Sequence, residues 1–197
     1  MAWLTFMKEV ILENKTTGAL GPSSKELAVA ITSLANLSES KVIVEYGSGD
    51  GVFTQEIGRR KNHDAFFMAM EVNEILVKAT RKRCPGVTVV HDGAQNVRAH
   101  LEKYGHSCCD TIISGLPWTR FDAALQDEIL NATYDILCPG GKFLTFAYAS
   151  SPLFPGGRRF FKEKLLQRFP KVERVGPIWK NIPPCHVYIA CKPLQQL

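Results

Sequence analysis

Apolar and polar residues along the chain follow two alternating periods. Short runs rich in β-branched and aromatic residues are typical of buried strands, whereas apolar residues that recur every three or four positions are typical of amphipathic helices. Proline–glycine breaks at residues 84–86 and 138–141 end two of the predicted helices. The pattern predicts strands over residues 41–46, 65–70, 87–90, 110–114, 142–148, 171–179 and 185–191, and helices over 2–14, 25–37, 54–60, 73–83, 95–103, 121–137 and 160–169.

The regular alternation of strands and helices predicts an α/β fold. We expect a doubly wound, Rossmann-like, mostly parallel sheet between two layers of helices, three layers in all, closed by a C-terminal hairpin. Residues 1–37 are predicted to form an N-terminal helical segment and residues 38–197 the core, within a single domain. Such sheets bind ligands at the carboxyl ends of their strands, so the residues that follow each strand are the candidates for a site.

Charge and cysteine content add modest constraints. Lysine and arginine exceed aspartate and glutamate by 24 − 19 = 5, and the excess is concentrated in residues 158–174. This segment is either a solvated helix face or a surface for an anionic partner. The six cysteines form no Cys-x-x-Cys pair, so we expect reduced thiols and no metal site. The sequence shows neither a bilayer-length apolar run nor a signal-peptide pattern, which favours a cytoplasmic protein.

A glycine-rich turn follows the first predicted strand of the core. Glycines allow a sharp turn and leave no Cβ between the main chain and a ligand. A dinucleotide-binding loop needs a further glycine two positions after Gly51, where this chain has Phe53. Glu45 precedes the turn and is expected to accept hydrogen bonds that hold it. The predicted cofactor contacts in this region are Glu45, Tyr46, Gly47, Ser48, Gly49 and Gly51.

Two acidic residues follow the next two predicted strands. Glu71 can accept both ribose hydroxyls of a nucleoside, and Asp92 can accept from an adenine amino group, although an aspartate there is also a common turn or cap residue. With the glycine turn, they resemble the class I S-adenosylmethionine-dependent methyltransferases. That resemblance implies a seven-stranded sheet with an antiparallel last strand. The remaining predicted cofactor contacts are Val72, Gly93, Ala94 and Ser114.

The loop after residue 114 is the candidate acceptor site. It resembles the Asn-Leu-Pro-Tyr motif of the rRNA adenine dimethylases at Leu116, Pro117 and the aromatic Trp118. Gly115 stands where those enzymes carry a polar side chain that accepts from the target nitrogen. This departure argues against methylation of a nucleobase amine, and we expect no nucleic-acid partner.

Four segments resemble the bacterial phospholipid N-methyltransferases of the PmtA type. They are residues 18–24 (GALGPSS), 114–117 (SGLP), 139–148, which contains a Pro-Gly-Gly turn and ends in Phe-Ala-Tyr, and 175–184 (VGPIWKNIPP). The resemblance implies transfer of methyl groups to the amine of phosphatidylethanolamine or a related aminolipid. It also implies peripheral contact with the inner face of the membrane.

The resemblance suggests roles that the residue pattern leaves open. Tyr148, the Gly115 carbonyl or a water would orient the amine, and Trp118, Tyr148 and Trp179 could surround an alkylammonium, or the tryptophans could be core residues. Leu116, Pro117, Trp179 and Asn181 are the predicted substrate contacts, and residues 1–14 and 158–174 the membrane contacts. The alternatives are a methyltransferase for a soluble amine or rRNA adenine, and an inactive cofactor-binding protein at the membrane.

Overall fold

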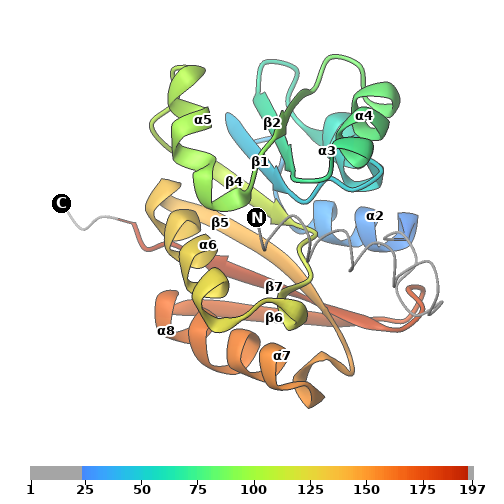
Figure 1. The fold of residues 1–197 in the computed structure, drawn as a ribbon, viewed down its shortest axis with the longest axis vertical. Helices are drawn as coiled ribbons and strands as arrows, with labels where there is room; N and C mark the ends of the chain where they lie inside the picture. Colours follow the sequence, from blue (N-terminus) through green and yellow to red (C-terminus); the bar gives the residue numbers. More distant parts are fainter. Residues whose placement is uncertain (1–23, 195–197) are drawn as a thin grey trace.

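The computed structural model describes residues 24–194, which form a central sheet flanked by helices (Figure 1). Within these residues the sheet has seven strands in the order β3-β2-β1-β4-β5-β7-β6. The strands are β1 Val42–Tyr46, β2 Phe66–Glu71, β3 Thr88–His91, β4 Cys109–Ser114, β5 Leu137–Tyr148, β6 Lys171–Ile178 and β7 Cys185–Cys191.

The helices begin where the sequence supplies a side chain for their free N–H groups. Ser24, Asn73 and Asp122 each accept backbone hydrogen bonds at the start of a helix. The helices are α2 Lys25–Ser33, α3 Val52–Arg60, α4 Glu74–Arg83, α5 Val97–Lys103, α6 Ala123–Ile136, α7 Pro155–Arg159 and α8 Leu165–Arg168. A π-helical stretch, Phe160–Lys164, joins α7 to α8, and short 3₁₀ turns span Ala94–Asn96, Trp118–Arg120 and Ser151–Leu153.

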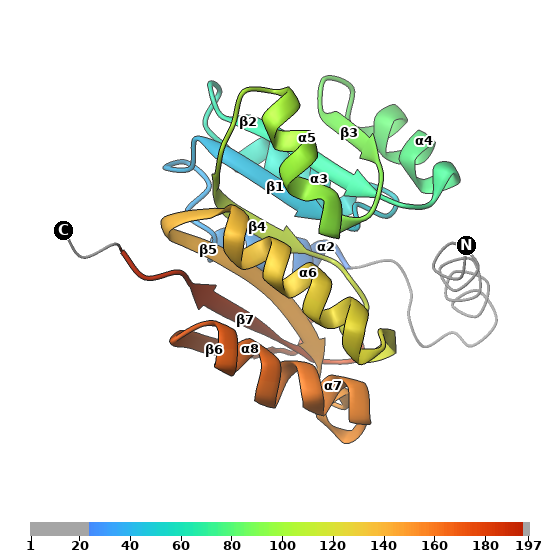
Figure 2. The ribbon, with the colours of Figure 1, turned by 60° about the vertical axis from the view of Figure 1, so that its left-hand side comes forward.

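Alternate residues of each strand enter two separate hydrophobic clusters, one on each face of the sheet. Val44 and Ile112 pack with α5, α6 and α8 on one face, and Ile43 and Ile113 pack with α2, α3 and α4 on the other. Figure 2 shows helices on both sides of the sheet. The predicted three-layer, doubly wound α/β fold is therefore confirmed.

The C-terminal hairpin reverses the direction of the sheet. β7 runs antiparallel between β5 and β6, with Tyr148 opposite Cys185 at one end and Lys142 opposite Cys191 at the other. The predicted antiparallel last strand is therefore confirmed. β5 also begins earlier than expected, because the Pro-Gly-Gly segment 139–141 continues the strand.

Several expectations concern other features of the chain. The predicted helix over residues 2–14 and the GALGPS part of the 18–24 motif lie outside the described residues. No helix among residues 24–194 is both long and apolar enough to cross a bilayer.

The expectation of reduced thiols is wrong for one pair of cysteines, since a disulfide joins Cys108, just before β4, to Cys138, near the start of β5. The four other cysteines are free.

Candidate functional site

The glycine turn adopts a backbone that side chains would strain. Gly47, Gly49 and Gly51 have φ angles of +72°, +57° and +89°, which fall in the left-handed region that favours glycine. A Cβ on Gly47 would also lie 3.0 Å from the Leu116 side chain of the neighbouring loop. The turn therefore depends on its glycines both for its conformation and for its close approach to the acceptor loop.

Hydrogen bonds from the neighbouring strand and helix fix the turn. The N–H groups of Gly47 and Ser48 donate to the Met70 carbonyl oxygen at 2.8 and 3.2 Å. Thr80 on α4 donates from its hydroxyl to the Gly49 carbonyl at 2.8 Å, and this hydroxyl also lies 3.1 Å from Ser48 Oγ. The predicted cofactor contact Ser48 is thus buried and bonded to Thr80, a residue that the sequence pattern did not single out.

Glu45 lies in the sheet directly beneath the turn and is fully buried. Its Oε2 accepts a 2.6 Å hydrogen bond from the Thr54 hydroxyl, whereas Oε1 has no hydrogen-bond partner among the described residues. Burial, opposed by the Thr54 hydrogen bond and reinforced by the charge of Glu71, raises the pKa of Glu45 from 4.5 to about 8. A buried carboxyl oxygen left without a hydrogen-bond partner is what a site for a polar ligand would contain.

Glu71 ends β2 and turns toward the same place. Its Oε2 accepts from the Gly49 N–H at 3.0 Å and its Oε1 from the Asn73 N–H at 2.9 Å. Burial raises the pKa of Glu71 despite these backbone donors, which lower it. The carboxylate thus links the glycine turn to the start of α4.

Asp92 follows β3, and its carboxylate contacts three residues that are close to it in sequence. Oδ1 accepts from the Gly93 N–H at 2.7 Å and from Asn96 Nδ2 at 2.9 Å, and Oδ2 lies 2.7 Å from His100 Nε2. Burial raises the pKa of Asp92, but the hydrogen bonds from His100, Asn96 and Gly93 together outweigh it and lower the pKa. Asp92 is therefore held ionised and oriented by α5.

These elements surround one pocket at the carboxyl edge of the sheet. Four loops and α6 contribute to it, as the strand order β3-β2-β1-β4 requires. Its walls are Gly47, Met70, Glu71, Val72, Asp92, Ala94, Leu116 and Ile129. Six of these residues were predicted from sequence as cofactor or substrate contacts. Met70 and Ile129 were not, because nothing in a strand or helix pattern shows which apolar residue faces a ligand.

The side chain of Tyr46 does not belong to this pocket. Its ring is fully buried in the core cluster, and only its backbone carbonyl reaches the site, where it accepts the Gly115 N–H at 2.8 Å. The prediction that the Tyr46 side chain contacts the cofactor is therefore wrong, and only the main chain of Tyr46 takes part in the site. Ser114 is buried too, and its Oγ accepts from the Leu116 N–H at 3.3 Å.

Gly115 packs against the glycine turn from the acceptor side. A Cβ at this position would lie 2.9 Å from the Gly47 carbonyl oxygen, which is closer than real Cβ contacts come. An asparagine or aspartate at 115 would therefore push the two loops apart. The adjacent Pro117 precedes the 3₁₀ turn that carries Trp118 into the core.

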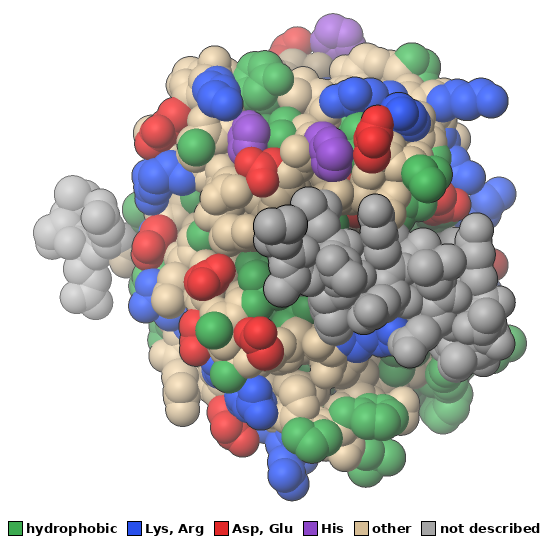
Figure 3. All heavy atoms as spheres, viewed as in Figure 1, with side chains coloured by type: hydrophobic (Ala, Val, Ile, Leu, Met, Phe, Trp, Pro, Cys, Tyr) green, Lys and Arg blue, Asp and Glu red, His purple; other side chains and the backbone are tan. Residues whose placement is uncertain are grey.

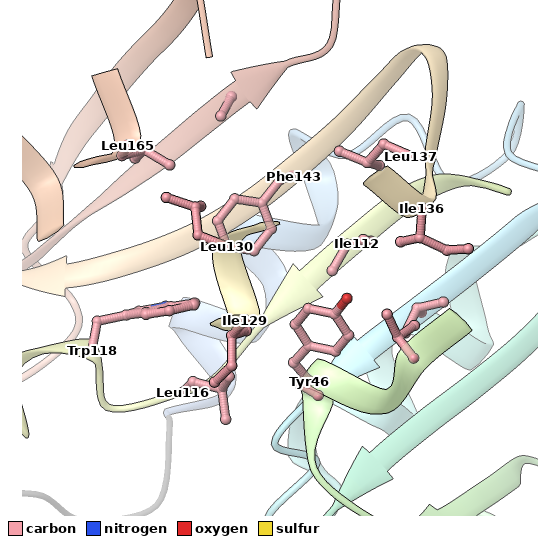
Figure 4. Packing of buried hydrophobic residues seen from close by; sticks show 14 of the residues in the cluster. Tyr46, Ile112, Leu116, Trp118, Ile129, Leu130, Ile136, Leu137, Phe143 and Leu165 are labelled. Atoms are coloured by element: carbon pink, nitrogen blue, oxygen red, sulfur yellow. The ribbon is translucent and has the colours of Figure 1, made fainter. Parts of the chain in front are cut away.

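The indole of Trp118 is a core group, contrary to the expectation that it faces the acceptor. The residue is 1% exposed, its ring stacks on Phe160 at 3.9 Å, and its Nε1 donates to Thr145 Oγ1 at 3.0 Å. Figure 4 shows it beside Ile129 and Leu130 on α6. A ring enclosed in this way cannot offer a face to an alkylammonium from solvent.

The remaining predicted substrate residues lie at the same edge but do not converge on the pocket. Tyr148 packs against Phe146 on the α2–α3 face of the sheet, opposite Trp118. Trp179 is exposed in the β6–β7 loop. Asn181 is buried, accepts from the Ser24 hydroxyl at 2.7 Å and donates to the Pro183 carbonyl at 2.7 Å, so its side chain joins the loop to α2 instead of facing a substrate.

Comparisons with known proteins agree with this geometry. No protein-family model matches the chain. The ornithine lipid N-methyltransferase of Singulisphaera acidiphila is 24% identical over 186 residues, which cover 93% of this chain and 92% of that protein. An O-methyltransferase from Bacillus cereus in complex with SAH aligns with a TM-score of 0.69 at 15% identity, covering 95% of this chain and 90% of that one. The chain has the class I methyltransferase fold.

A second solved structure supports the same assignment. The N-methyltransferase NodS from Bradyrhizobium japonicum aligns with a TM-score of 0.63 at 12% identity, covering 86% of this chain and 96% of that one. The resemblance to class I S-adenosylmethionine-dependent methyltransferases that the sequence predicts is confirmed, in enzyme class and in cofactor. In this methyltransferase fold, the left-handed glycines, the unpaired Glu45 Oε1 and the acidic pocket walls fit S-adenosylmethionine.

Proposed function

We propose that the chain is an S-adenosylmethionine-dependent N-methyltransferase that acts on the primary amine of an aminolipid, phosphatidylethanolamine or a related lipid. The observation that carries this proposal is the similarity to the ornithine lipid N-methyltransferase, which extends over 93% of the chain. A second observation supports it. Position 115 has no room for the polar side chain that a planar nucleobase amine would need.

The residues of the pocket would hold the cofactor in defined ways. The turn Gly47–Gly51 and Glu45 would hold its methionyl end, Glu71 its ribose hydroxyls, and Asp92 with the Ala94 N–H its adenine. When bound, S-adenosylmethionine supplies a methyl group made electrophilic by its positive sulfur. The protein's task is then to place a nitrogen lone pair in line with that methyl group at near-attack distance.

The acceptor amine must lose its proton before it can attack. The Gly115 carbonyl oxygen accepts no hydrogen bond within residues 24–194 and is available to hold an N–H of the acceptor. Burial raises the pKa of Tyr148, so its phenol stays protonated near neutral pH. This phenol packs on the α2–α3 face, away from the pocket, so the Gly115 carbonyl or a water would orient the amine, and water would take up the proton.

Membrane association belongs to the same proposal. The acceptor sits in a bilayer, so the protein must act at the inner membrane surface as a peripheral enzyme. Residues 158–174, with their basic excess, would contact anionic headgroups, together with residues 1–14 from the N-terminal segment 1–37. We expect no nucleic-acid partner.

A lipid panel tests the proposed function directly. The full chain is incubated with methyl-labelled S-adenosylmethionine and detergent-dispersed phosphatidylethanolamine, ornithine lipid, phosphatidylglycerol or total RNA, and the products are separated by headgroup. We expect label in an aminolipid and none in phosphatidylglycerol, which has no amine. Label only in RNA, or only in water-soluble amines, would refute the lipid acceptor. A Gly47→Val variant, which cannot form the turn, is the inactive control.

A further inference from the structure

Four large apolar side chains protrude from two loops beside the pocket. Leu153 and Phe154 follow β5 and are 83% and 57% exposed, and Trp179 and Ile182 lie in the β6–β7 loop and are 74% and 91% exposed. Burying such side chains is favourable, so a soluble monomer rarely displays several of them near one another without a partner. We call these four residues the apolar rim.

The sheet places both loops of the apolar rim at the carboxyl edge, where the pocket lies. Tyr148 at the end of β5 pairs with Cys185 at the start of β7, and the Ala149 N–H donates to the Pro184 carbonyl at 2.8 Å. The two loops therefore leave the sheet side by side. In Figure 3 hydrophobic side chains are visible at the lower edge of the molecule, where Figure 1 draws α7 and the turn before it.

One half of the apolar rim is joined to the acceptor loop. Gln126 on α6 donates from Nε2 to the Trp118 carbonyl at 2.7 Å and to the Gly156 carbonyl at 3.1 Å. There is no space for a side chain on Gly156, because its Cβ would overlap the Thr119 carbonyl. Leu153 and Phe154 are thus held directly beside the 115–120 loop.

The other half is held by the C-terminal hairpin. Asn181, between Trp179 and Ile182, is buried and bonded to Ser24 and to the Pro183 carbonyl. This anchor fixes the loop from the inside while its two apolar neighbours point outward. The exposed side chains are therefore presented on a braced loop and not on a free strand of chain.

The two segments that carry the apolar rim contain basic side chains and no acidic ones. Residues 149–162 and 179–186 contain no aspartate or glutamate, and they carry Arg158, Arg159, Lys162 and Lys180. None of these four forms an ion pair with the described residues, whereas Lys164 and Arg168, farther along the same helical stretch, pair with Asp127 and Asp135. Unpaired cations around exposed apolar side chains match an anionic phospholipid surface, which offers both negative headgroups and an apolar interior.

We propose that the apolar rim inserts into the interface of an anionic phospholipid bilayer and turns the carboxyl edge of the sheet toward it. The acceptor loop then faces the headgroups, so a lipid amine reaches the pocket without leaving the membrane. This inference rests on the proposed lipid acceptor and names the surface that meets the bilayer. That surface is distinct from residues 1–14 and extends beyond residues 158–174.

The fluorescence of Trp179 can report whether the apolar rim enters the bilayer. In a Trp3→Phe variant the remaining tryptophans are the buried Trp118 and the exposed Trp179. Vesicles of phosphatidylglycerol and phosphatidylcholine should shift the emission to shorter wavelength, and brominated lipid should quench it, because the exposed indole enters the acyl region. Vesicle binding without quenching by brominated lipid would overturn the proposal.

Substitutions test the contribution of each part. Trp179→Ser with Ile182→Ser should lower the partition coefficient onto phosphatidylglycerol-containing vesicles by about tenfold or more. Arg158→Glu with Lys180→Glu should weaken binding and reduce its dependence on salt. The matched control is Leu194→Ser, which removes an exposed apolar side chain from the opposite edge of the sheet and should leave binding within about twofold of wild type. Equal vesicle binding by the rim variant and wild type would overturn the proposal. A protein partner would then be the expected occupant of the apolar rim.

The two proposals fail separately. Turnover on detergent-dispersed aminolipid does not require a bilayer, so rim variants should keep it and should bind S-adenosylmethionine as wild type does. Methylation of dispersed lipid by a wild-type chain that binds no vesicles would refute the apolar rim and the other proposed membrane contacts, and would leave the aminolipid acceptor standing. Quenching of Trp179 by brominated lipid in a chain that methylates no aminolipid would support the rim and refute the proposed acceptor.

Discussion

Replacing Trp118 with alanine removes a ring that the structure encloses on every side. The indole stacks on Phe160 at 3.9 Å, meets the edges of Phe121 and Phe143 at 5.7 and 6.1 Å, and donates to Thr145. Deleting a buried tryptophan costs about 3–5 kcal/mol of unfolding free energy. For a chain of this size, that corresponds to a melting temperature lower by roughly 6–20 °C.

A second substitution separates the hydrogen bond from the packing. Thr145→Val keeps the shape of the site but leaves the buried indole N–H without its acceptor, which costs about 1–3 kcal/mol. In the double variant with Trp118→Ala this penalty disappears, because the donor is gone. The two losses should therefore be clearly less than additive, and a double-mutant cycle measures the difference.

The assay is urea unfolding followed by circular dichroism, with the slope compared among variants so that a change in midpoint reports stability. Trp179→Ala is the matched control, since this tryptophan is exposed and its loss should change stability by at most about 0.5 kcal/mol. The reasoning is refuted if Trp118→Ala loses less than about 1 kcal/mol while its KM for the aminolipid rises. That result would place the indole in the acceptor site.

The other predictions concern the pocket. His100→Ala removes the partner of Asp92 Oδ2 and should weaken S-adenosylmethionine binding about fivefold in calorimetry, with unchanged affinity contradicting the role given to His100. Gly115→Asn should abolish turnover and lower the melting temperature, because its Cβ meets the Gly47 carbonyl; full activity would contradict that contact. Glu45 is neutral below its raised pKa of about 8, so the stability that it contributes is lost as pH rises from about 4.5 through 8. The stability of Glu45→Gln relative to wild type should therefore increase from pH 5.5 to pH 8.5 in urea unfolding, and a constant difference would refute the shift.

Sequence periodicity was sufficient for the fold because the strands of this sheet are short, apolar and separated by helices. The residues after three of these strands, Gly47, Glu71 and Asp92, indeed line one pocket. This convergence is expected in a parallel sheet, because the carboxyl ends of its strands share one edge. That these residues bind S-adenosylmethionine is still a prediction to be tested by binding measurements.

The pattern of apolar and polar residues could not predict which side chains from different segments contact one another. An aromatic residue after a strand can face either solvent or core, and Trp118 faces the core because Phe160, far along the chain, supplies a stacking partner. Asn181 resembled a substrate contact, but Ser24 bonds to it across 157 positions. His100 lies opposite Asp92 because α5 begins at Val97. The helical period alone does not predict the residue at which a helix begins.

The position of β7 has a consequence for how the protein is made. β7 is the last strand of the described chain, yet it lies between β5 and β6, and β6 pairs with no other strand among residues 24–194. The strands β3, β2, β1, β4 and β5 can associate as soon as they leave the ribosome, whereas β6 must wait for residues 185–191. A nascent chain that stops before residue 185 therefore contains the residues that line the pocket but lacks the hairpin that braces the β6–β7 loop. The apolar rim that we propose to meet the bilayer is therefore complete only once β7 has been synthesised.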